Sequence, residues 1–194
     1  MRHPALLDRE RTALILIDLQ EGYRDALHGW EQVVAASTLL VRGVEVLGVP
    51  LIVTEQYPKG LGSTTTEVRT LMGRQVEVVE KRSMSCWGAQ PFRDRLDALG
   101  RRQVLVAGIE THACVNQTVH DLLAAGYEAH VARDATSSRR AADVGPAWEK
   151  MQLAGMRPTS SEQALLELVR SADAPEFKIL QRLLKETLIP PAGV

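Results

Sequence analysis

The chain has 194 residues and a net charge of −1, with 45% hydrophobic and 24% charged residues. This balance is typical of a water-soluble globular protein, and we expect a single domain over residues 1–194 with a core of about residues 11–185. The near-zero charge, without long runs of one sign, disfavours nucleic acid or an anionic membrane as a partner, and no stretch of about 18 apolar residues predicts a membrane span.

Short apolar runs alternate with longer segments of helical periodicity, a pattern typical of an α/β fold. Residues Thr12–Ile17 are continuously apolar and β-branched, as expected of a strand buried on both faces. Further strands are predicted over residues 49–54, 76–79, 104–109, 128–132 and 156–159. Helices are predicted over residues 31–47, 91–99, 114–125, 144–153, 162–170 and 175–186, before a loose tail at 189–194. We therefore predict a three-layer α/β/α fold with a six-stranded, mostly parallel sheet.

Several helix ends carry recognisable signals. Gly48 and Gly126 follow apolar helical patterns and are plausible helix ends. Ser160, with Gln163 three residues later, predicts a capping box at the start of a helix.

Three reactive side chains fall at the carboxyl ends of predicted strands. Asp18 follows the first strand, Lys81 follows the third, and Cys114 opens the helix after the fourth. Each alone has an ordinary interpretation, as a turn aspartate, a surface lysine or a small buried thiol. Ligands of open parallel sheets bind at the carboxyl edge, so the shared edge favours a catalytic site.

Cys114 is the candidate nucleophile. The helix start and the Lys81 cation both favour a thiolate, so we expect an acidic, reactive Cys114. Asp18 would accept the thiol proton and later return it, or share one proton with the sulfur at rest. Backbone amides of Glu110 and Cys114 would hold the developing oxyanion. We expect the other cysteine, Cys86, to be a packed thiol.

The same segments resemble a known family. Residues 104–115 (VLVAGIETHACV) resemble the nucleophile segment of isochorismatase-like hydrolases, a superfamily of cysteine hydrolases. Residues 14–20 (LILIDLQ) resemble its first strand with the catalytic aspartate, and residues 80–85 (EKRSMS) resemble the segment with its lysine. Matches at residues 52–65, 134–139, 159–168 and 175–185 are similar to isochorismatase domain-containing proteins. The resemblance covers about residues 11–185.

The resemblance implies catalytic roles for Asp18, Lys81 and Cys114. It also implies a cis peptide bond between Ile109 and Glu110, which turns the amides of Glu110 and Cys114 toward the oxyanion. A homo-oligomer is implied as well. The amphipathic segment 176–184 offers a surface for it, although core packing explains the same pattern.

Two departures from the family narrow the chemistry. Nicotinamidases of this fold bind a metal through an aspartate and two histidines after the second strand, where residues 54–59 (TEQYPK) contain no histidine. We therefore expect no metal and no cofactor. True isochorismatases lack the cysteine, so Cys114 points away from enol-ether cleavage.

Weaker candidates surround the predicted site. Substrate contacts are proposed for Gln20, Tyr23, Glu55, Gln56 and Trp87. Trp87 is more often a packing residue than a substrate contact, and His112 could contact either substrate or a neighbouring residue.

The sequence thus predicts hydrolysis of a C–N bond in a small amide, carbamoyl or ureide compound. Enol-ether or thioester hydrolysis on the same scaffold, and a non-catalytic binding or scaffold protein, are the alternatives. Two cysteines are too few for a disulfide framework and the N-terminus has no secretory pattern, so we expect a cytoplasmic protein.

Overall fold

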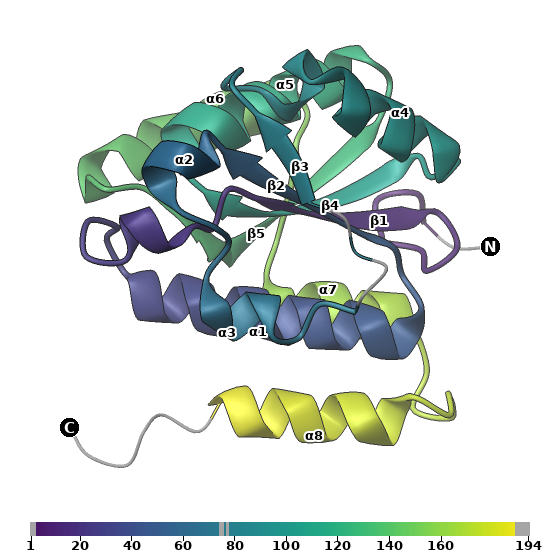
Figure 1. The fold of residues 1–194 in the computed structure, drawn as a ribbon. Coiled ribbons are helices and arrows are strands. Elements are labelled where there is room, and N and C mark those ends of the chain that lie inside the picture. Colours follow the sequence, from purple (N-terminus) through teal and green to yellow (C-terminus); the bar gives the residue numbers. More distant parts are fainter. Residues whose placement is uncertain (1–2, 74–75, 77, 189–194) are drawn as a thin grey trace.

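Six strands form one parallel sheet in the order β3-β2-β1-β4-β5-β6 (Figure 1). The structure is a computed structural model that describes residues 3–73, 76 and 78–188. The strands are β1 Thr12–Ile17, β2 Leu51–Gln56, β3 Val78–Lys81, β4 Gln103–Ile109, β5 Glu128–Ser137 and β6 Arg157–Thr159. The predicted six-stranded sheet is confirmed, and every pairing in it is parallel.

Helices cover both faces of this sheet. The helices are α1 Trp30–Leu47, α2 Pro58–Leu61, α3 Thr66–Arg69, α4 Gln90–Ala98, α5 Asn116–Ala124, α6 Val144–Leu153, α7 Ser161–Val169 and α8 Phe177–Leu188, with short turns of 3-10 or π helix at η1 Glu21–Tyr23, η2 Cys86–Gly88, η3 Thr111–Val115 and η4 Ala141–Asp143. Figure 1 shows α1 and α7 on one face and α4, α5 and α6 on the other. The last helix, α8, lies outside α1, so it adds an outer layer to the predicted three.

The central strand β1 explains how two hydrophobic cores form around one sheet. All six residues of β1 are buried, and their side chains alternate between the faces. Leu14 and Leu16 pack into the core beneath α1 and α7. Ala13, Ile15 and Ile17 pack into the core beneath α4, α5 and α6. A continuous apolar run is therefore required here, as the sequence indicated.

Local signals set several element ends correctly. Gly48 takes a left-handed conformation, with φ of 65°, at the end of α1. The Ser160 side chain accepts a hydrogen bond of 3.2 Å from the amide of Gln163 at the start of α7, as in the predicted capping box. The predicted bounds of β1 and α6 are confirmed. The predicted tail at 189–194 lies outside the described residues.

Strand ends at the carboxyl edge were predicted less well. The predicted second and third strands end two residues too early, and the fifth ends five too early. Lys81 is therefore the last residue of β3 rather than a residue after it, and it pairs in register with Gln56 of β2. Polar residues continue these strands because their side chains find partners at the edge, which apolar patterning does not reveal.

Gly108 allows β4 to approach β1 closely beside this edge. Its φ is +107°, and an added Cβ would overlap the backbone of Ile17, the residue before Asp18. The register between β4 and β5 shifts between Val106 and Gly108. Glycine is thus needed where the strands that lead to Asp18 and Cys114 meet.

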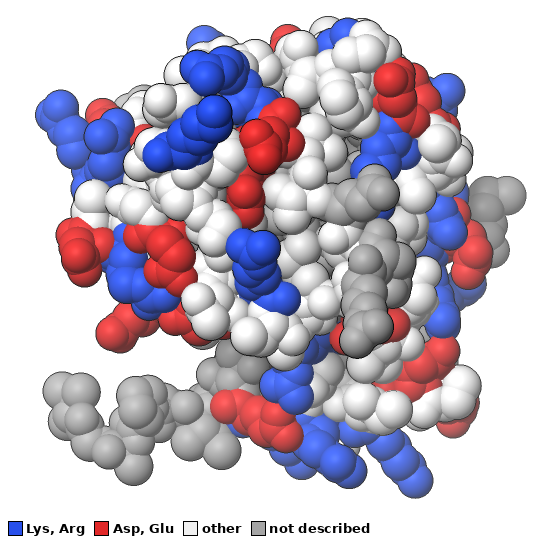
Figure 2. All heavy atoms as spheres, in the orientation of Figure 1, with Lys and Arg blue, Asp and Glu red and all other residues white. Residues whose placement is uncertain are grey.

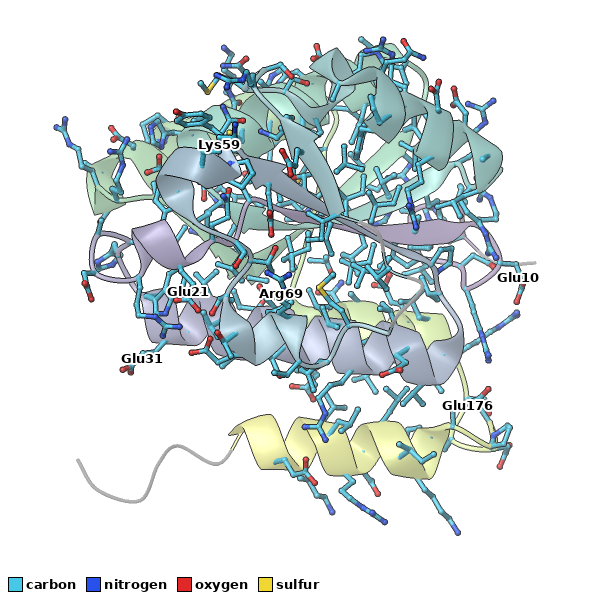
Figure 3. All side chains as sticks on the ribbon, in the orientation of Figure 1. Glu10, Glu21, Glu31, Lys59, Arg69 and Glu176 are labelled. Atoms are coloured by element: carbon cyan, nitrogen blue, oxygen red, sulfur yellow. The ribbon has the colours of Figure 1, made fainter. Side chains whose placement is uncertain are left out.

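Charged side chains of both signs are spread over the face seen in Figure 2. Figure 3 shows Glu10 and Glu31 pointing away from the body of the molecule. No helix in the described ranges is both long and apolar enough to cross a membrane.

Candidate active site

The side chains of Asp18, Lys81 and Cys114 converge at the carboxyl edge of the sheet, as their shared edge predicted. Lys81 Nζ lies 2.7 Å from Asp18 Oδ2 and 3.5 Å from Cys114 Sγ. The three residues are only 1%, 4% and 6% exposed, respectively. An ion pair and a thiol therefore share one site that is nearly closed to solvent.

Asp18 occupies a constrained position directly after β1. Its φ of 49° places it in the left-handed region, which aspartate tolerates better than most residues. Its backbone amide donates to the Thr54 carbonyl oxygen at 3.1 Å, and the Thr54 hydroxyl donates to Asp18 Oδ1 at 2.7 Å. These two bonds to β2 orient the carboxylate so that Oδ2 faces the ammonium of Lys81.

Lys81 is held by oxygen acceptors as well as by Asp18. Its Nζ donates to Gln56 Oε1 at 2.8 Å and to the carbonyl oxygens of Ser83 and Met84 at 3.1 and 3.0 Å. Burial alone would lower the pKa of this ammonium, but the Asp18 carboxylate acts in the opposite direction, and the pKa lies above its ordinary value. Lys81 is therefore a fixed cation beside the thiol.

Cys114 lies within η3, the π turn that leads into α5. The amides of Ala113 and Val115 both donate to the Glu110 carbonyl oxygen, at 3.0 and 3.2 Å. The peptide bond between Ile109 and Glu110 is cis, as the family resemblance implied. The turn places the sulfur at the start of a helix, where backbone amides face outward from the helix end.

The structure contradicts the expectation of an acidic Cys114. Burial, followed by the Asp18 carboxylate, raises the pKa of this thiol to about 12, although Lys81 lowers it. The cation and the helix start favour the thiolate, but the near-complete burial disfavours it more strongly. The resting site therefore holds a neutral thiol beside the ion pair of Asp18 and Lys81.

Cys86 behaves as a packed thiol, as expected. It is fully buried, and burial raises its pKa to about 11. Its Sγ lies 3.7 Å from Thr54 Oγ1, and its amide donates to Thr118 Oγ1 at 2.9 Å.

Three proposed substrate contacts serve the protein's own structure. Gln20 is fully buried, and its amide bonds to backbone groups of Gln56 and Gly62. Glu55 accepts two hydrogen bonds from Thr64 and, by strand alternation, lies on the opposite face of β2 from Gln56. Gln56 lies in the site, but its side-chain oxygen is engaged by Lys81. Gln20 and Glu55 hold the loop that follows β2, and Gln56 holds the ammonium of Lys81.

The remaining candidates differ in position. Tyr23 is half-buried, and burial followed by the negative charge of Glu110 raises the pKa of its hydroxyl. The ring of Trp87 packs edge-on against Tyr127, with centroids 5.9 Å apart, so the packing interpretation is favoured. The His112 ring nitrogen Nδ1 lies 2.9 Å from the Ser138 hydroxyl, so the ring contacts a neighbouring residue.

Two features of the site were missed by sequence reasoning. Thr54 bonds to Asp18, and strand alternation from Gln56 could have placed it on the same face. The buried carboxylate of Glu110 pairs with Arg139, whose Nε donates at 2.9 Å and whose side chain is 58% exposed. No sequence pattern links these two residues, because Glu110 follows β4 and Arg139 follows β5.

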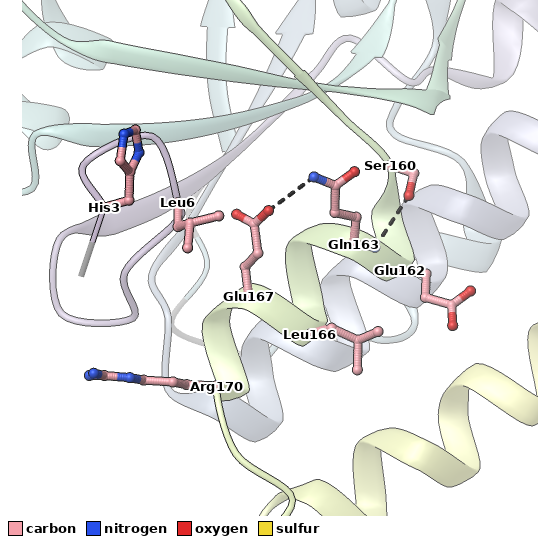
Figure 4. A pocket seen from close by; sticks show the side chains of 8 residues that line it. All are labelled: His3, Leu6, Ser160, Glu162, Gln163, Leu166, Glu167 and Arg170. Atoms are coloured by element: carbon pink, nitrogen blue, oxygen red, sulfur yellow. Dashed lines mark hydrogen bonds between the residues drawn. The ribbon is translucent and has the colours of Figure 1, made fainter. Parts of the chain in front are cut away.

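Other features of the surface lie apart from this site. A groove of about 720 Å³ runs between α7 and the N-terminal segment, and Figure 4 shows it lined by residues such as Leu6, Leu166 and Arg170 and by none of the three candidate catalytic residues. Within the described part of the chain, no three His, Cys, Asp or Glu side chains gather closely enough to hold a metal ion.

Comparison with known proteins gives consistent matches. The family model "Isochorismatase domain" matches residues 12–163. Isochorismatase domain-containing protein 1 of Salmo salar is 38% identical over 183 residues, which are 94% of this chain and 64% of the salmon protein. Isochorismatase domain-containing protein 2A of Mus musculus is 37% identical over 187 residues, 95% of this chain and 87% of the mouse protein. The chain thus spans less than two thirds of the salmon relative's length.

A solved structure described as the MAR1 ribonuclease from Caenorhabditis elegans is also similar. It superposes with a TM-score of 0.89 and 34% sequence identity, covering 97% of this chain and 99% of the nematode chain.

Proposed function

The chain belongs to the isochorismatase family, as its motifs predicted, and from this we propose that it is a cysteine hydrolase acting on a C–N bond. The proposed substrate is a small amide, carbamoyl or ureide compound, and the proposed nucleophile is Cys114. The family and its fold support a hydrolase in general; the bond cleaved and the covalent intermediate are our proposal.

One observation carries this proposal. Lys81 Nζ contacts both Asp18 Oδ2, at 2.7 Å, and Cys114 Sγ, at 3.5 Å, inside a buried site. A base, a cation and a nucleophile within hydrogen-bonding reach are the parts that acyl transfer through a thiol requires.

The first half of the reaction forms an acyl-enzyme. Because the pKa of the Cys114 thiol is raised to about 12, the thiolate forms as Asp18 Oδ2 takes the proton. The sulfur attacks the substrate carbonyl carbon, and the negative charge on its oxygen faces the amides of Glu110 and Cys114. Asp18 then donates its proton to the nitrogen, the C–N bond breaks, and the amine leaves a thioester on Cys114.

The second half restores the enzyme. Asp18, now a carboxylate again, accepts a proton from water as the water oxygen attacks the thioester carbon. The C–S bond breaks, the acid product leaves, and Cys114 regains its proton from Asp18. Lys81 stays charged throughout and offsets the negative charge as it moves between carboxylate and sulfur.

The enclosed position of Cys114 favours small substrates. With 6% of the residue exposed, a bulky or duplex substrate has little access to the sulfur. The nematode relative is described as a ribonuclease, so RNA belongs in the test as a competing substrate. The mixed charges on the face seen in Figure 2 lack the basic stripe expected of a nucleic-acid surface.

The test is a panel assay with covalent trapping. Amides, ureides, carbamoyl compounds, isochorismate, thioesters and RNA are incubated with the wild type, Cys114→Ala and the matched control Cys86→Ala. We expect hydrolysis of a C–N substrate, an acyl adduct on the Cys114 peptide by mass spectrometry, and loss of both only in Cys114→Ala. Turnover that survives Cys114→Ala contradicts the mechanism, and binding without turnover across the panel favours the scaffold alternative.

Further parts of the proposal concern the whole protein. We propose a single domain that needs no metal or cofactor, so activity should survive exhaustive chelation and gain nothing from added zinc. Both cysteines are free thiols, in keeping with a reducing cytoplasmic location. We also propose a homo-oligomer, to be measured by light scattering of the full chain.

A further inference from the structure

Thr54 links the two strands that carry the ion pair. It lies on β2, between β1, which leads to Asp18, and β3, which ends at Lys81. Thr54 and Gln56 are two residues apart and share one face of the strand. The Thr54 hydroxyl bonds to Asp18 Oδ1 at 2.7 Å, and Gln56 Oε1 bonds to Lys81 Nζ at 2.8 Å. One strand face therefore holds both partners of the pair.

The direction of the hydrogen bonds at Thr54 follows from its single proton. An ionised carboxylate only accepts, so the hydroxyl proton goes to Asp18 Oδ1. The Cys86 thiol, 3.7 Å from Thr54 Oγ1, is then the donor to the hydroxyl oxygen. Because Thr54 is fully buried, no solvent molecule competes for these bonds. The orientation stabilises a charged Asp18 and disfavours a neutral one.

We propose that Thr54 is a positioning residue that keeps the proton shared by Asp18 and Cys114 on the sulfur in the resting enzyme. This inference rests on the proposed function, in which Asp18 is the base for Cys114. The step it controls is transfer of one proton from Cys114 Sγ to Asp18 Oδ2, with no change in net charge. Thr54 stabilises the state before that transfer, and the transfer goes to completion as the thiolate attacks the substrate carbonyl carbon.

Other groups face Asp18 from the surrounding elements. Lys81 from β3 and Cys114 from η3 contact the carboxylate region directly, Cys86 lies beyond Thr54 on η2, and Tyr23 of η1 lies within electrostatic range. Lys81 attracts the negative charge in either position, because its Nζ lies 2.7 Å from Asp18 Oδ2 and 3.5 Å from Cys114 Sγ. Of the two groups that share the proton, the Thr54 hydroxyl bonds only to Asp18, so it discriminates between the two positions of that proton.

Loss of the hydroxyl has a specific signature. Thr54→Val destabilises only the state with an ionised Asp18 and a neutral thiol, so the fraction of thiolate rises. Alkylation by iodoacetamide forms a bond from the thiolate sulfur to carbon and releases iodide, so its rate reports that fraction. We expect the neutral-pH rate at Cys114 to rise roughly tenfold, and the acidic midpoint of the pH–rate profile to rise by about one pH unit. Below the midpoint the two rates should converge.

The experiment follows alkylation from about pH 4 to about pH 9, with each cysteine resolved by peptide mass spectrometry. Thr54→Ser retains the hydroxyl and should match the wild type. Thr54→Ala removes the same hydroxyl and gives a second measurement if the valine variant folds poorly. Thr12→Val is the matched control, because Thr12 is also fully buried but lies at the amino end of β1. Cys86 should stay unreactive in every folded variant.

A double variant separates positioning from general damage. In an Asp18→Asn background there is no carboxylate to stabilise, so adding Thr54→Val should leave the Cys114 profile unchanged. An effect that persists in that background, or a Thr54→Val profile equal to the wild type, overturns the inference. The readout needs no substrate, so a protein without amidase activity that shows the predicted profile would overturn the proposed function and not the role of Thr54.

Discussion

The ammonium of Lys81 lies 2.7 Å from Asp18 Oδ2, and each side chain is at most 2% exposed. Removing one member of such a pair leaves the other charge buried and unpaired. We therefore expect Lys81→Met to lower the free energy of unfolding by about 3–5 kcal/mol, measured by urea denaturation. Lys81→Met combined with Asp18→Asn should recover most of the loss. An unchanged urea midpoint in the single variant would mean that the pair contributes nothing to stability.

Asp18 controls the Cys114 thiol through its negative charge. After burial, that charge is the largest factor that raises the pKa of Cys114, while Lys81 lowers it. Asp18→Asn should therefore move the alkylation profile of Cys114 to lower pH and raise the neutral-pH rate by roughly tenfold or more. Hydrolysis should nevertheless disappear, because no proton remains for the leaving nitrogen. Slower alkylation in this variant is the opposite of what the geometry predicts.

Gly108 should not accept a side chain. Gly108→Ala would force a Cβ into the backbone of Ile17 at a φ of +107°, so we expect a loss of more than about 2 kcal/mol of stability or failure to fold. Gly145 is the matched control, because it lies within α6 and an added Cβ there meets no atom within 4 Å. Gly145→Ala should raise stability by about 0.5–1 kcal/mol in the same thermal or urea unfolding assay.

The buried thiols predict a loss of stability in alkaline solution. The pKa of Cys86 is about 11 in the folded protein, above an ordinary value near 9, so its contribution is complete below pH 9 and is lost as the pH rises toward 11. The expected loss from this residue is about 2–3 kcal/mol, and Cys114 adds to it in the same direction. Cys86→Ala should flatten the dependence of the urea midpoint on pH above 9. An equally steep decline in that variant would assign the effect to other groups.

The sequence by itself determined the fold class and the edge at which the reactive residues meet. Continuous apolar runs such as Thr12–Ile17 predict strands buried on both faces, and parallel strands bring their carboxyl ends to one edge. The closeness of Asp18 and Cys114 therefore follows from the order of strands and helices along the chain. The motifs around Cys114 predicted the family and, through it, the cis peptide bond between Ile109 and Glu110.

Only the tertiary structure decided how the polar side chains at that edge are used. Gln20 and Glu55 are polar residues of the kind that contact substrates, but their side chains bond to the loop that follows β2. Thr54 and Gln56 instead hold the ion pair, because β2 lies between β1 and β3. Strand order and side-chain direction at strand ends depend on distant segments, which periodicity along the chain does not encode.

The state of Cys114 depended on tertiary structure for the same reason. Helix position and a nearby lysine, both evident in the sequence, predict an acidic thiol. Burial and the Asp18 carboxylate act in the opposite direction and raise the pKa to about 12. Desolvation depends on every segment that packs around the sulfur, so the balance between cation, anion and burial is fixed only once the chain has folded.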